Sequence, residues 1–273
     1  MMGEQIEWMS LERIAEAAEG EGAVVGVTIV APNGERFCRH QLRQFRAAST
    51  VKIPIMIAIY RQIDRGELSP EQSFVLAAPD KTPGSGELQF LHDGIVLTLD
   101  DLISLMISIS DNTATNMLID LAGLDHVNAT MRALGMTGSG LNRKMKGVPS
   151  QPGDPENWAT PDDYARVMAA ILDGTAASAE SCARMITMLE RQVSEGRIAR
   201  YLPKTEGIRW GSKTGTIGNA TNDVGFIEAN GRRLIMSFFC EGFVNTHLAE
   251  QVIGELSRAA MLVTGLVQPL PVS

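Results

Sequence analysis

Residues 49–59 read Ser-Thr-Val-Lys-Ile-Pro-Ile-Met-Ile-Ala-Ile, a partly polar start followed by an almost unbroken apolar run. Apolar residues on every side of a helix are typical of a helix that is buried in the core. On the N-terminal side, residues 23–30 and 36–41 are expected to form two strands, joined by a turn at residues 32–34. The chain therefore passes from a β-hairpin directly into a buried helix.

Helical patterns continue through the middle of the chain. Thr98 and Asp101 fit a capping box that opens the first of these helices. We expect helices at residues 98–109, 113–121, 127–134, 161–173 and 179–195. Residues 66–96 are expected to be irregular, and residues 143–160, with three prolines, are expected to form a long loop.

Strand-like patterns return near the C-terminus. They cover residues 207–212, 223–229 and 234–241, with Asn230-Gly231 as a hairpin turn, and helical spacing recurs at 11–18 and 246–262. These elements predict an α+β fold, an α/β sandwich in which one antiparallel sheet is built from both chain ends and flanked by terminal helices. The predicted α/β lobe comprises residues 1–45 and 196–273, and residues 46–195 form an inserted all-helical lobe, with the active site in the cleft between the lobes.

The composition argues against nucleic-acid binding and against a metal site. The 273 residues carry a net charge of −8, whereas phosphate binding requires clustered Lys and Arg. Cys38, Cys182 and Cys240 form no Cys-x-x-Cys pair, and the histidines form no His-x-x-x-His pair. We therefore expect reduced cysteines, no bound metal and no cofactor.

The N-terminal residues predict the compartment. Glu4, Glu7, Glu12 and Glu16 interrupt the apolar residues there, whereas a signal peptide begins with basic residues followed by an apolar run. No apolar stretch reaches the ~18 residues of a membrane span. As written, the sequence predicts a cytoplasmic protein, or a periplasmic or secreted one if an export signal has been removed.

Ser49 and Lys52 are three residues apart at the start of the buried helix, so their side chains project from one face. The free N–H groups and the positive end of a helix suit a nucleophilic oxygen. The lysine can take the serine proton only when it is neutral, a state that burial and a second cation would favour, and Lys213 is the candidate cation. Alone, Ser-x-x-Lys occurs by chance in many proteins.

Ser110-Asp111-Asn112 lies between two expected helices. In such a turn Ser110 and Asn112 point the same way, so Ser110 is a candidate to relay a proton to a leaving nitrogen. Asn112 is a candidate to donate a hydrogen bond to a substrate carbonyl. Asp111 is expected to brace the turn, because Asp readily bonds neighbouring backbone groups.

Lys213-Thr214-Gly215 lies in an expected strand, where alternation places Lys213 and Gly215 on one face. Thr214, Gly215 and Thr216 are candidate substrate-binding residues, because a glycine in a strand lets a substrate backbone approach closely. The backbone N–H groups of Ser49 and Thr216 are the expected donors of an oxyanion hole.

Ser-x-x-Lys, Ser-Asp-Asn and Lys-Thr-Gly, in this order, are the motif set of class A β-lactamases and penicillin-binding proteins. Residues 97–102, residues 110–116 and the Thr160-Pro161 pair also resemble that family, over roughly residues 10–265. The chain thus resembles the class A β-lactamase-like serine hydrolases. The resemblance implies a helical lobe beside an α/β lobe, with Ser49 as the nucleophile and Lys52 as its proton partner. It also implies that Ser110 and Asn112 form the second catalytic element and Lys213 the third.

Two features depart from the family pattern. Residues 143–160 contain no Glu-x-x-Leu-Asn string, whose glutamate activates the deacylating water in class A enzymes. Glu156 is a candidate for that role, with a solvated surface residue as the alternative. An arginine usually grips the substrate carboxylate just after Lys-Thr-Gly, and Arg209 is a candidate to replace it.

The sequence thus predicts a serine hydrolase that cleaves an amide or ester, a β-lactam or a related acyl substrate, through a Ser49 acyl-enzyme. Two alternatives stay open. The chain could be a penicillin-binding or sensor-type domain that acylates and deacylates poorly, or a cytoplasmic peptidase or esterase. The expected partner is a small-molecule acyl substrate (β-lactam, peptide or ester), and neither nucleic acid nor a membrane.

Overall fold

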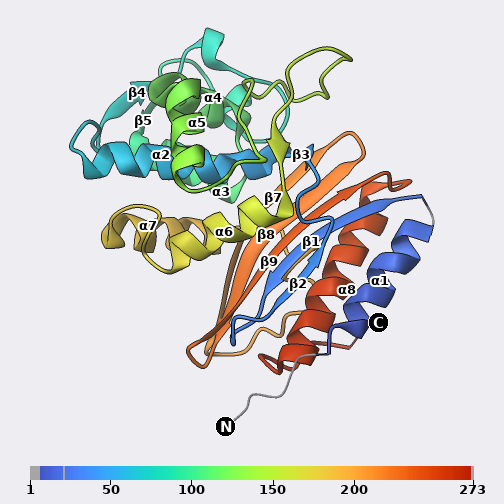
Figure 1. Cartoon of the computed structure of the whole chain (residues 1–273). Coiled ribbons are helices and arrows are strands. Elements are labelled where there is room, and N and C mark those ends of the chain that lie inside the picture. The colour runs from blue at the N-terminus through green and yellow to red at the C-terminus, as the bar shows by residue number, and fades with distance from the viewer. Residues whose placement is uncertain (1–6, 21, 272–273) are drawn as a thin grey trace.

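The computed structural model describes residues 7–20 and 22–271 (Figure 1). Glu4, one of the acidic residues used to predict the compartment, lies outside the described residues. Within the described ranges, no helix combines the length and the apolar character needed to cross a membrane.

A five-stranded sheet forms the centre of the α/β lobe. In spatial order its strands are β2 (Arg36–Arg39), β1 (Val24–Val30), β9 (Arg232–Glu241), β8 (Ala220–Ala229) and β7 (Ile208–Ile217). Every neighbouring pair is antiparallel, and β1 pairs with β9, so the two ends of the chain meet inside one sheet. The predicted fold class is confirmed. Strand β2 is shorter than expected because His40 turns into the left-handed region, with a φ of 46°.

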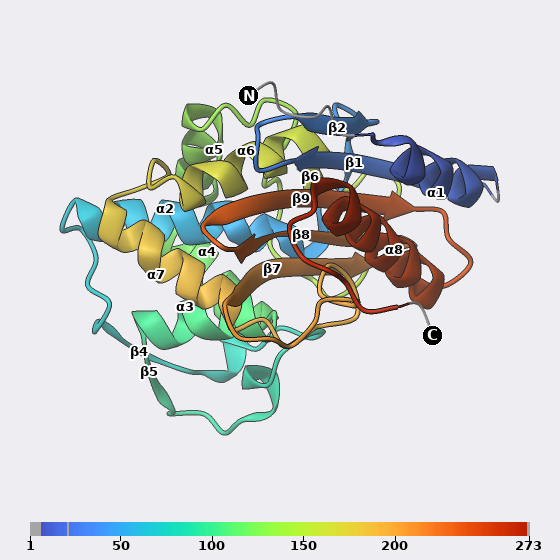
Figure 2. The ribbon, with the colours of Figure 1, turned by 90° about the horizontal axis from the view of Figure 1, so that it is seen from below.

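Helices cover both faces of this sheet, as Figure 2 shows. Helices α1 (Met9–Gly20) and α8 (Thr246–Thr264) pack on one face, and α6 (Pro161–Leu172) and α7 (Ala179–Glu190) pack on the other. Val25, Val27 and Ile29 of β1 are fully buried in the cluster beneath the terminal helices. Their spacing of two residues follows from the alternation of side chains along a strand.

The helical lobe is built around α2 (Lys52–Asp64), in which every residue from Lys52 to Tyr60 is buried. The helices around it are α3 (Leu99–Ser108), α4 (Asn112–Ala122), α5 (Leu124–Ala133) and α7. The expectation of a buried helix is therefore confirmed. Each fully buried isoleucine contributes roughly 1.5–3 kcal/mol of hydrophobic stabilisation, so this run of residues anchors the lobe.

Local signals at two turns are also confirmed. The Thr98 hydroxyl accepts a hydrogen bond from the Asp101 backbone at 3.1 Å, and the Asp101 carboxylate accepts one from the Thr98 backbone at 2.9 Å. Asn230 and Gly231 adopt φ values of 53° and 69°. Positive φ at both positions is the requirement of the tight hairpin turn that the sequence predicts.

Three expectations about elements are wrong. Residues 66–96 contain two short paired strands and two 3-10 turns, because apolar residues of the strands pack against the helical core. These elements are β4 (Ser73–Val75), η2 (Ala78–Asp80), η3 (Leu88–Phe90) and β5 (Val96–Thr98). Helix α7 ends at Glu190, not at residue 195, and the chain after it runs beside the sheet. Ser49 lies in a 3-10 turn, η1 (Ala48–Val51), which leads into α2.

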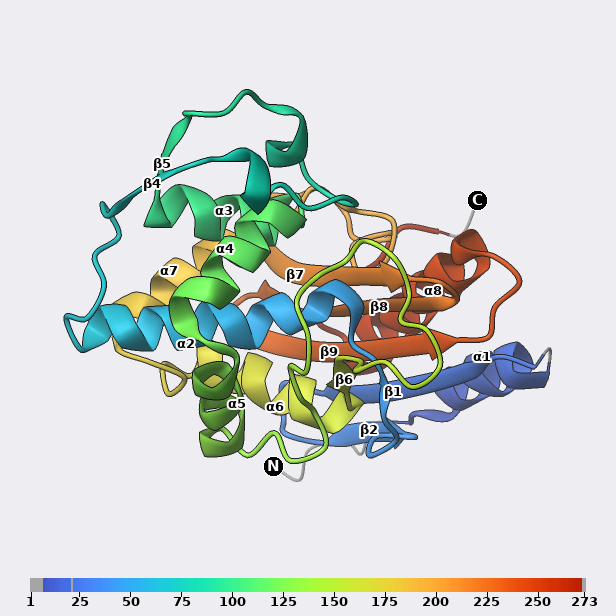
Figure 3. The same cartoon turned by 90° about the horizontal axis from the view of Figure 1, so that it is seen from above.

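One small sheet links the two lobes. Strand β3 (Phe45–Arg46), just before η1, pairs with β6 (Trp158–Ala159), at the end of the loop after α5. Figure 3 shows this loop crossing near the N-terminal end of α2, where the helical lobe meets the sheet. The η1 turn, which carries Ser49, and the loop that ends at β6 are thus held next to each other.

Candidate active site

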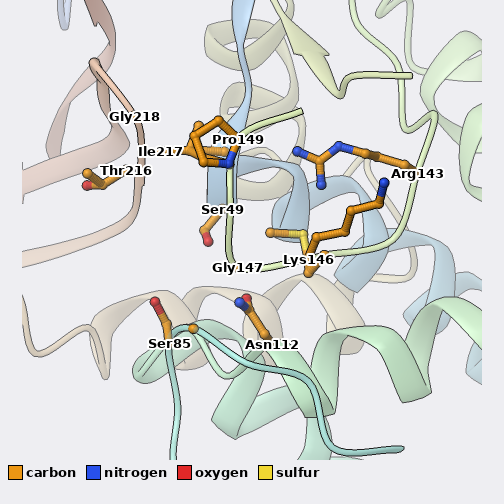
Figure 4. Close-up of a pocket in the computed structure, with 13 residues that line it drawn as sticks. Ser49, Ser85, Asn112, Arg143, Lys146, Gly147, Pro149, Thr216, Ile217 and Gly218 are labelled. Carbon is orange, nitrogen blue, oxygen red and sulfur yellow. The ribbon is translucent and has the colours of Figure 1, made fainter. Parts of the chain in front are cut away.

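Ser49 lies on the wall of a pocket of about 220 Å³, at the point where the helical lobe meets β7. Figure 4 shows Ser49 with Thr216 and Gly218 on one side and Arg143 and Lys146 on the other. The residue before Ser49, Ala48, has a φ of 47°. A left-handed alanine is unfavourable, and such strain often accompanies a nucleophile that the surrounding structure holds in place.

Lys52 is fully buried one helical turn after Ser49. Its Nζ donates to the carbonyl of Ser110 at 2.7 Å, and it lies 3.0 Å from both the Ser110 hydroxyl and Asn112 Oδ1. Burial, and next the charge of Lys213, lower the pKa of Lys52 well below its usual value. The structure therefore brings the first two predicted motifs together and favours the neutral amine.

The turn at residues 110–112 is braced as expected. Asp111 caps α4 by accepting from the backbone of Ala114 at 2.9 Å, and its other oxygen accepts from the backbone of Leu88 at 2.9 Å. Ser110 itself has a φ of 61°, an uncommon value for a serine. These two bonds hold that conformation, which places the Ser110 hydroxyl at Lys52.

Lys213 is fully buried in β7, and its Nζ donates to the carbonyl of Thr214 at 3.0 Å. Burial lowers the pKa of Lys213 to about 7; Asp223 opposes this shift, and Arg197 adds to it. Lys213 in turn lowers the pKa of Lys52, which is the predicted effect of a second cation.

Gly215 allows a close approach within the protein itself. A Cβ on Gly215 would lie 3.0 Å from the Ala47 carbonyl oxygen and 3.0 Å from the Ser49 nitrogen. The close approach is therefore between β7 and the protein's own nucleophile turn. Thr216, one residue further on this edge strand, lines the same pocket as Ser49, so both predicted oxyanion donors belong to one wall.

The expected role for Arg209 is wrong. Its exposed guanidinium pairs with Glu190 at 2.7 Å and Glu228 at 3.3 Å, at the far end of β7 from Lys213-Thr214-Gly215. Because these carboxylates hold it there, Arg209 cannot serve the pocket.

The sequence did not single out Arg197, which lies next to the pocket end of β7. It is 4% exposed, and it donates to the carbonyls of Asn222 at 2.6 Å and Gly215 at 3.1 Å. It also donates to the Thr216 hydroxyl at 2.6 Å and pairs with Glu250 at 3.0 Å. Arg197 therefore supports the pocket end of β7 from behind. It lies in a segment expected to be non-helical, with no motif to mark it.

Glu156 is neither a solvated residue nor part of the pocket wall. It is 8% exposed and pairs with Arg143 at 2.8 Å, while its Oε1 also accepts from the Asn157 backbone at 2.8 Å. The expectation of a solvated carboxylate is wrong, because this pair is enclosed by the loop. Arg143, not Glu156, reaches the pocket lining.

Met145 is a second pocket residue that the sequence did not single out. The side-chain amide of Asn116 accepts from the Met145 N–H at 2.9 Å and donates to its carbonyl at 3.0 Å. Asn116 ends the string that carried the family resemblance, so that string contained an indirect signal. The two bonds fix the backbone of an apolar residue that lines the same pocket as Ser49.

Solved structures of known proteins share this fold. The crystal structure of a β-lactamase from Sphaerobacter thermophilus DSM 20745 is 56% identical, with a TM-score of 0.94, and covers 96% of this chain and 99% of that chain. The structure of PBP-A is 25% identical, with a TM-score of 0.86, over 95% of this chain and 97% of that chain. A further structure holds a mutant of PBP-A as an acyl-enzyme complex with penicillin G.

Relatives that are similar in sequence are also β-lactamases. The β-lactamase CTX-M-6 of Salmonella typhimurium is 28% identical over 263 residues, which cover 93% of this chain and 88% of that protein. The β-lactamase BRO-1 of Moraxella catarrhalis is 26% identical over 221 residues, or 80% of this chain and 70% of that protein. The model of the Beta-lactamase enzyme family matches residues 10–263, and the chain belongs to this family of serine acyl-enzyme hydrolases.

Proposed function

We propose that this chain opens β-lactam amides through a Ser49 acyl-enzyme and hydrolyses that acyl-enzyme slowly. The observation that carries the first half is the contact of the buried Lys52 amine with Ser110 and Asn112, one turn from Ser49. The absence of any carboxylate among the described residues that line the pocket carries the second half.

Acylation requires proton transfers that the site can support. Ser49 Oγ would attack the lactam carbonyl as its proton passes to the neutral Lys52. The C–N bond then breaks, and Ser110, which contacts Lys52, would deliver a proton to the leaving nitrogen. The backbone N–H groups of Ser49 and Thr216 would stabilise the negative oxygen of the tetrahedral intermediate.

Deacylation requires a base that activates water, and no carboxylate among the described pocket-lining residues is placed for it. Glu156 is engaged by Arg143 inside the loop, and the pocket position next to Asn116 is Met145. Lys52 is the remaining candidate base, but it is fully buried and is not among the described residues that line the pocket. We therefore propose that deacylation limits turnover.

The penicillin-binding or sensor-type reading is the second candidate, and the same carboxylate-free wall favours it. The two readings differ in the lifetime of the acyl-enzyme and not in its formation. An esterase or peptidase would differ in the substrate that forms the adduct, since its preferred acyl donor would be an ester or a peptide.

A mass-spectrometric time course separates these readings. The protein is incubated with a fluorescent penicillin, or with a nitrophenyl ester, and its intact mass is followed. We expect a Ser49 adduct with the penicillin that forms quickly and decays slowly. Ser49→Ala should give no adduct, whereas Ser108→Ala, a serine of α3 outside the pocket lining, should label normally.

Two results would contradict the proposal. Rapid turnover of the ester without a penicillin adduct would indicate an esterase. Neither an adduct nor hydrolysis with either probe, from protein with a native far-UV spectrum, would contradict acyl-enzyme chemistry altogether.

A further inference from the structure

The pocket wall opposite β7 carries positive charge. Arg143 and Lys146 are the ionisable residues among the described pocket-lining residues, and both lie on the side of Ser49 away from Thr216 (Figure 4). This wall is cationic although the whole chain has a net charge of −8. A cleft lined by charge of one sign attracts ligands of the opposite sign.

Lys146 is the more accessible cation of this wall. Its side chain is 52% exposed, and its Nζ lies 3.8 Å from Asp154, whose side chain is 43% exposed. An exposed pair at this distance contributes little, so the ammonium remains available to a ligand. Arg143 is 7% exposed and is already paired with Glu156, but its buried Nε makes no hydrogen bond in the described part of the chain.

The backbone on either side of Lys146 is fixed. Met145 is bonded by Asn116 through both its N–H and its carbonyl. Gly147 has a φ of 70°, and a Cβ there would lie 2.5 Å from the Pro83 carbonyl oxygen, so the loop is pressed against the opposite wall. Lys146 thus projects from a stretch of backbone that contacts hold on both sides.

We propose that Lys146, beside the unpartnered Nε of Arg143, forms a subsite for a negatively charged group on the acyl part of the substrate. The inference rests on the proposed function and adds a substrate class to it: acyl donors that carry a second anionic group, on the side of the scissile amide that faces the loop. Lys213 belongs to β7 and not to the loop that carries Lys146, so this subsite is separate from the Lys-Thr-Gly motif.

Three penicillins that differ at one carbon test the inference. Benzylpenicillin has no charge on its acyl side chain, carbenicillin has an additional carboxylate at the α-carbon, and ampicillin has an ammonium there. Their second-order acylation rates are measured by competition with the fluorescent penicillin, at low and at high salt. We expect carbenicillin to acylate faster than ampicillin, with a difference that shrinks as salt is added.

Substitutions assign the effect to the loop. Lys146→Gln should lower the carbenicillin rate about five-fold relative to the benzylpenicillin rate, and Lys146→Glu should reverse the order of carbenicillin and ampicillin. Lys144→Gln is the matched control, because Lys144 is half-exposed on the same loop but pairs with Asp120 outside the pocket lining. It should leave the ratio unchanged.

The outcomes are distinguishable. Adducts with all three penicillins at a ratio that Lys146→Gln and Lys146→Glu do not move would overturn the subsite and leave the proposed function intact. An equal change in Lys144→Gln would also overturn it, since the effect would then be general electrostatics of the loop. No adduct with any penicillin would overturn the proposed function and the subsite with it.

Discussion

The backbone nitrogen of Ser49 lies 3.0 Å from the place where a Cβ on Gly215 would stand. The carbonyl oxygen of Ala47 lies equally close, at 3.0 Å. Strand β7 therefore touches the backbone of η1, the turn that carries Ser49. The separation between the two predicted oxyanion donors, the N–H groups of Ser49 and Thr216, depends on a residue without a side chain at position 215.

Gly215→Ala should reduce penicillin acylation by about 100-fold, because the added methyl group pushes η1 away from β7 and misplaces Ser49. The measurement is the second-order labelling rate, with folding checked by thermal unfolding. Gly140→Ala is the control, since a Cβ there meets its nearest atom at 3.6 Å. Equal labelling by both variants would show that the contact does not position the nucleophile.

The titration of Lys213 should make the acylation rate fall as the pH rises through neutrality. Its pKa of about 7 means that it is protonated below this pH and neutral above it. Protonated Lys213 supplies positive charge for a substrate carboxylate, so kcat/KM for benzylpenicillin should fall as pH rises through about 7. Lys213→Arg keeps its charge and should not show this fall in rate. A fall that persists in Lys213→Arg would assign the titration to another group.

Arg197→Ala should weaken both the fold and the site. Removal of the guanidinium leaves buried carbonyls of Gly215 and Asn222 without this donor and leaves Glu250 uncompensated, at a cost of about 3 kcal/mol in the free energy of unfolding. Arg209→Ala, which removes exposed ion pairs on β7, should cost less than about 1 kcal/mol in the free energy of unfolding. Urea unfolding and labelling rates check both variants, and similar costs would contradict the assignment.

Met145→Glu should shorten the life of the acyl-enzyme. The Asn116 amide would still hold the backbone, and the new carboxylate would extend from the pocket wall that contains Ser49, where it can activate water. General-base catalysis typically supplies at least about 100-fold, so adduct decay should accelerate by roughly that factor. Met145→Gln has nearly the same shape without the base and should leave the decay slow. Equal decay in the two variants would exclude a base effect.

Glu156→Ala should destabilise the chain by about 3–5 kcal/mol, because it leaves the Arg143 charge buried without its partner. Asp154→Ala, on the exposed part of the same loop, should change stability by less than about 1 kcal/mol. Denaturant unfolding of the two variants side by side gives the comparison. A small cost for Glu156→Ala would mean that Arg143 finds another partner or reaches water.

Local patterns were sufficient for most of the architecture. The apolar run after Ser49 predicted the buried helix, the Thr98–Asp101 box predicted a helix start, and Asn230-Gly231 predicted a hairpin. Each is decided by residues within a few positions of one another. The small β4–β5 sheet was missed because its three-residue strands are stabilised by packing on the helical lobe, which no short window contains.

The site residues fall into two similar groups, those predicted from short motifs and those recognised only from their contacts. Ser49, Lys52, Ser110, Asn112 and Lys213 were found from motifs, because their chemistry constrains neighbours along the chain. Arg197, Arg143 and Met145 carry no such mark. Arg197 contacts Gly215, Arg143 pairs with Glu156, and Met145 is bonded by Asn116, and in each pair the residues are far apart in the sequence, so only the folded chain reveals these roles.

The sequence by itself determined the fold class and the order of the motifs, and it predicted Ser49 as the nucleophile and Lys52 as its partner, since periodicity and short spacing are properties of consecutive residues. Only the tertiary structure decided that Glu156 is bound by Arg143, that Arg197 supports β7, that Arg209 is paired at the far end of β7, and that Arg143 and Lys146 line the same pocket as Ser49. Those relationships depend on burial and on distances between elements far apart along the chain, and burial sets both the pKa of a lysine and the partner of a carboxylate.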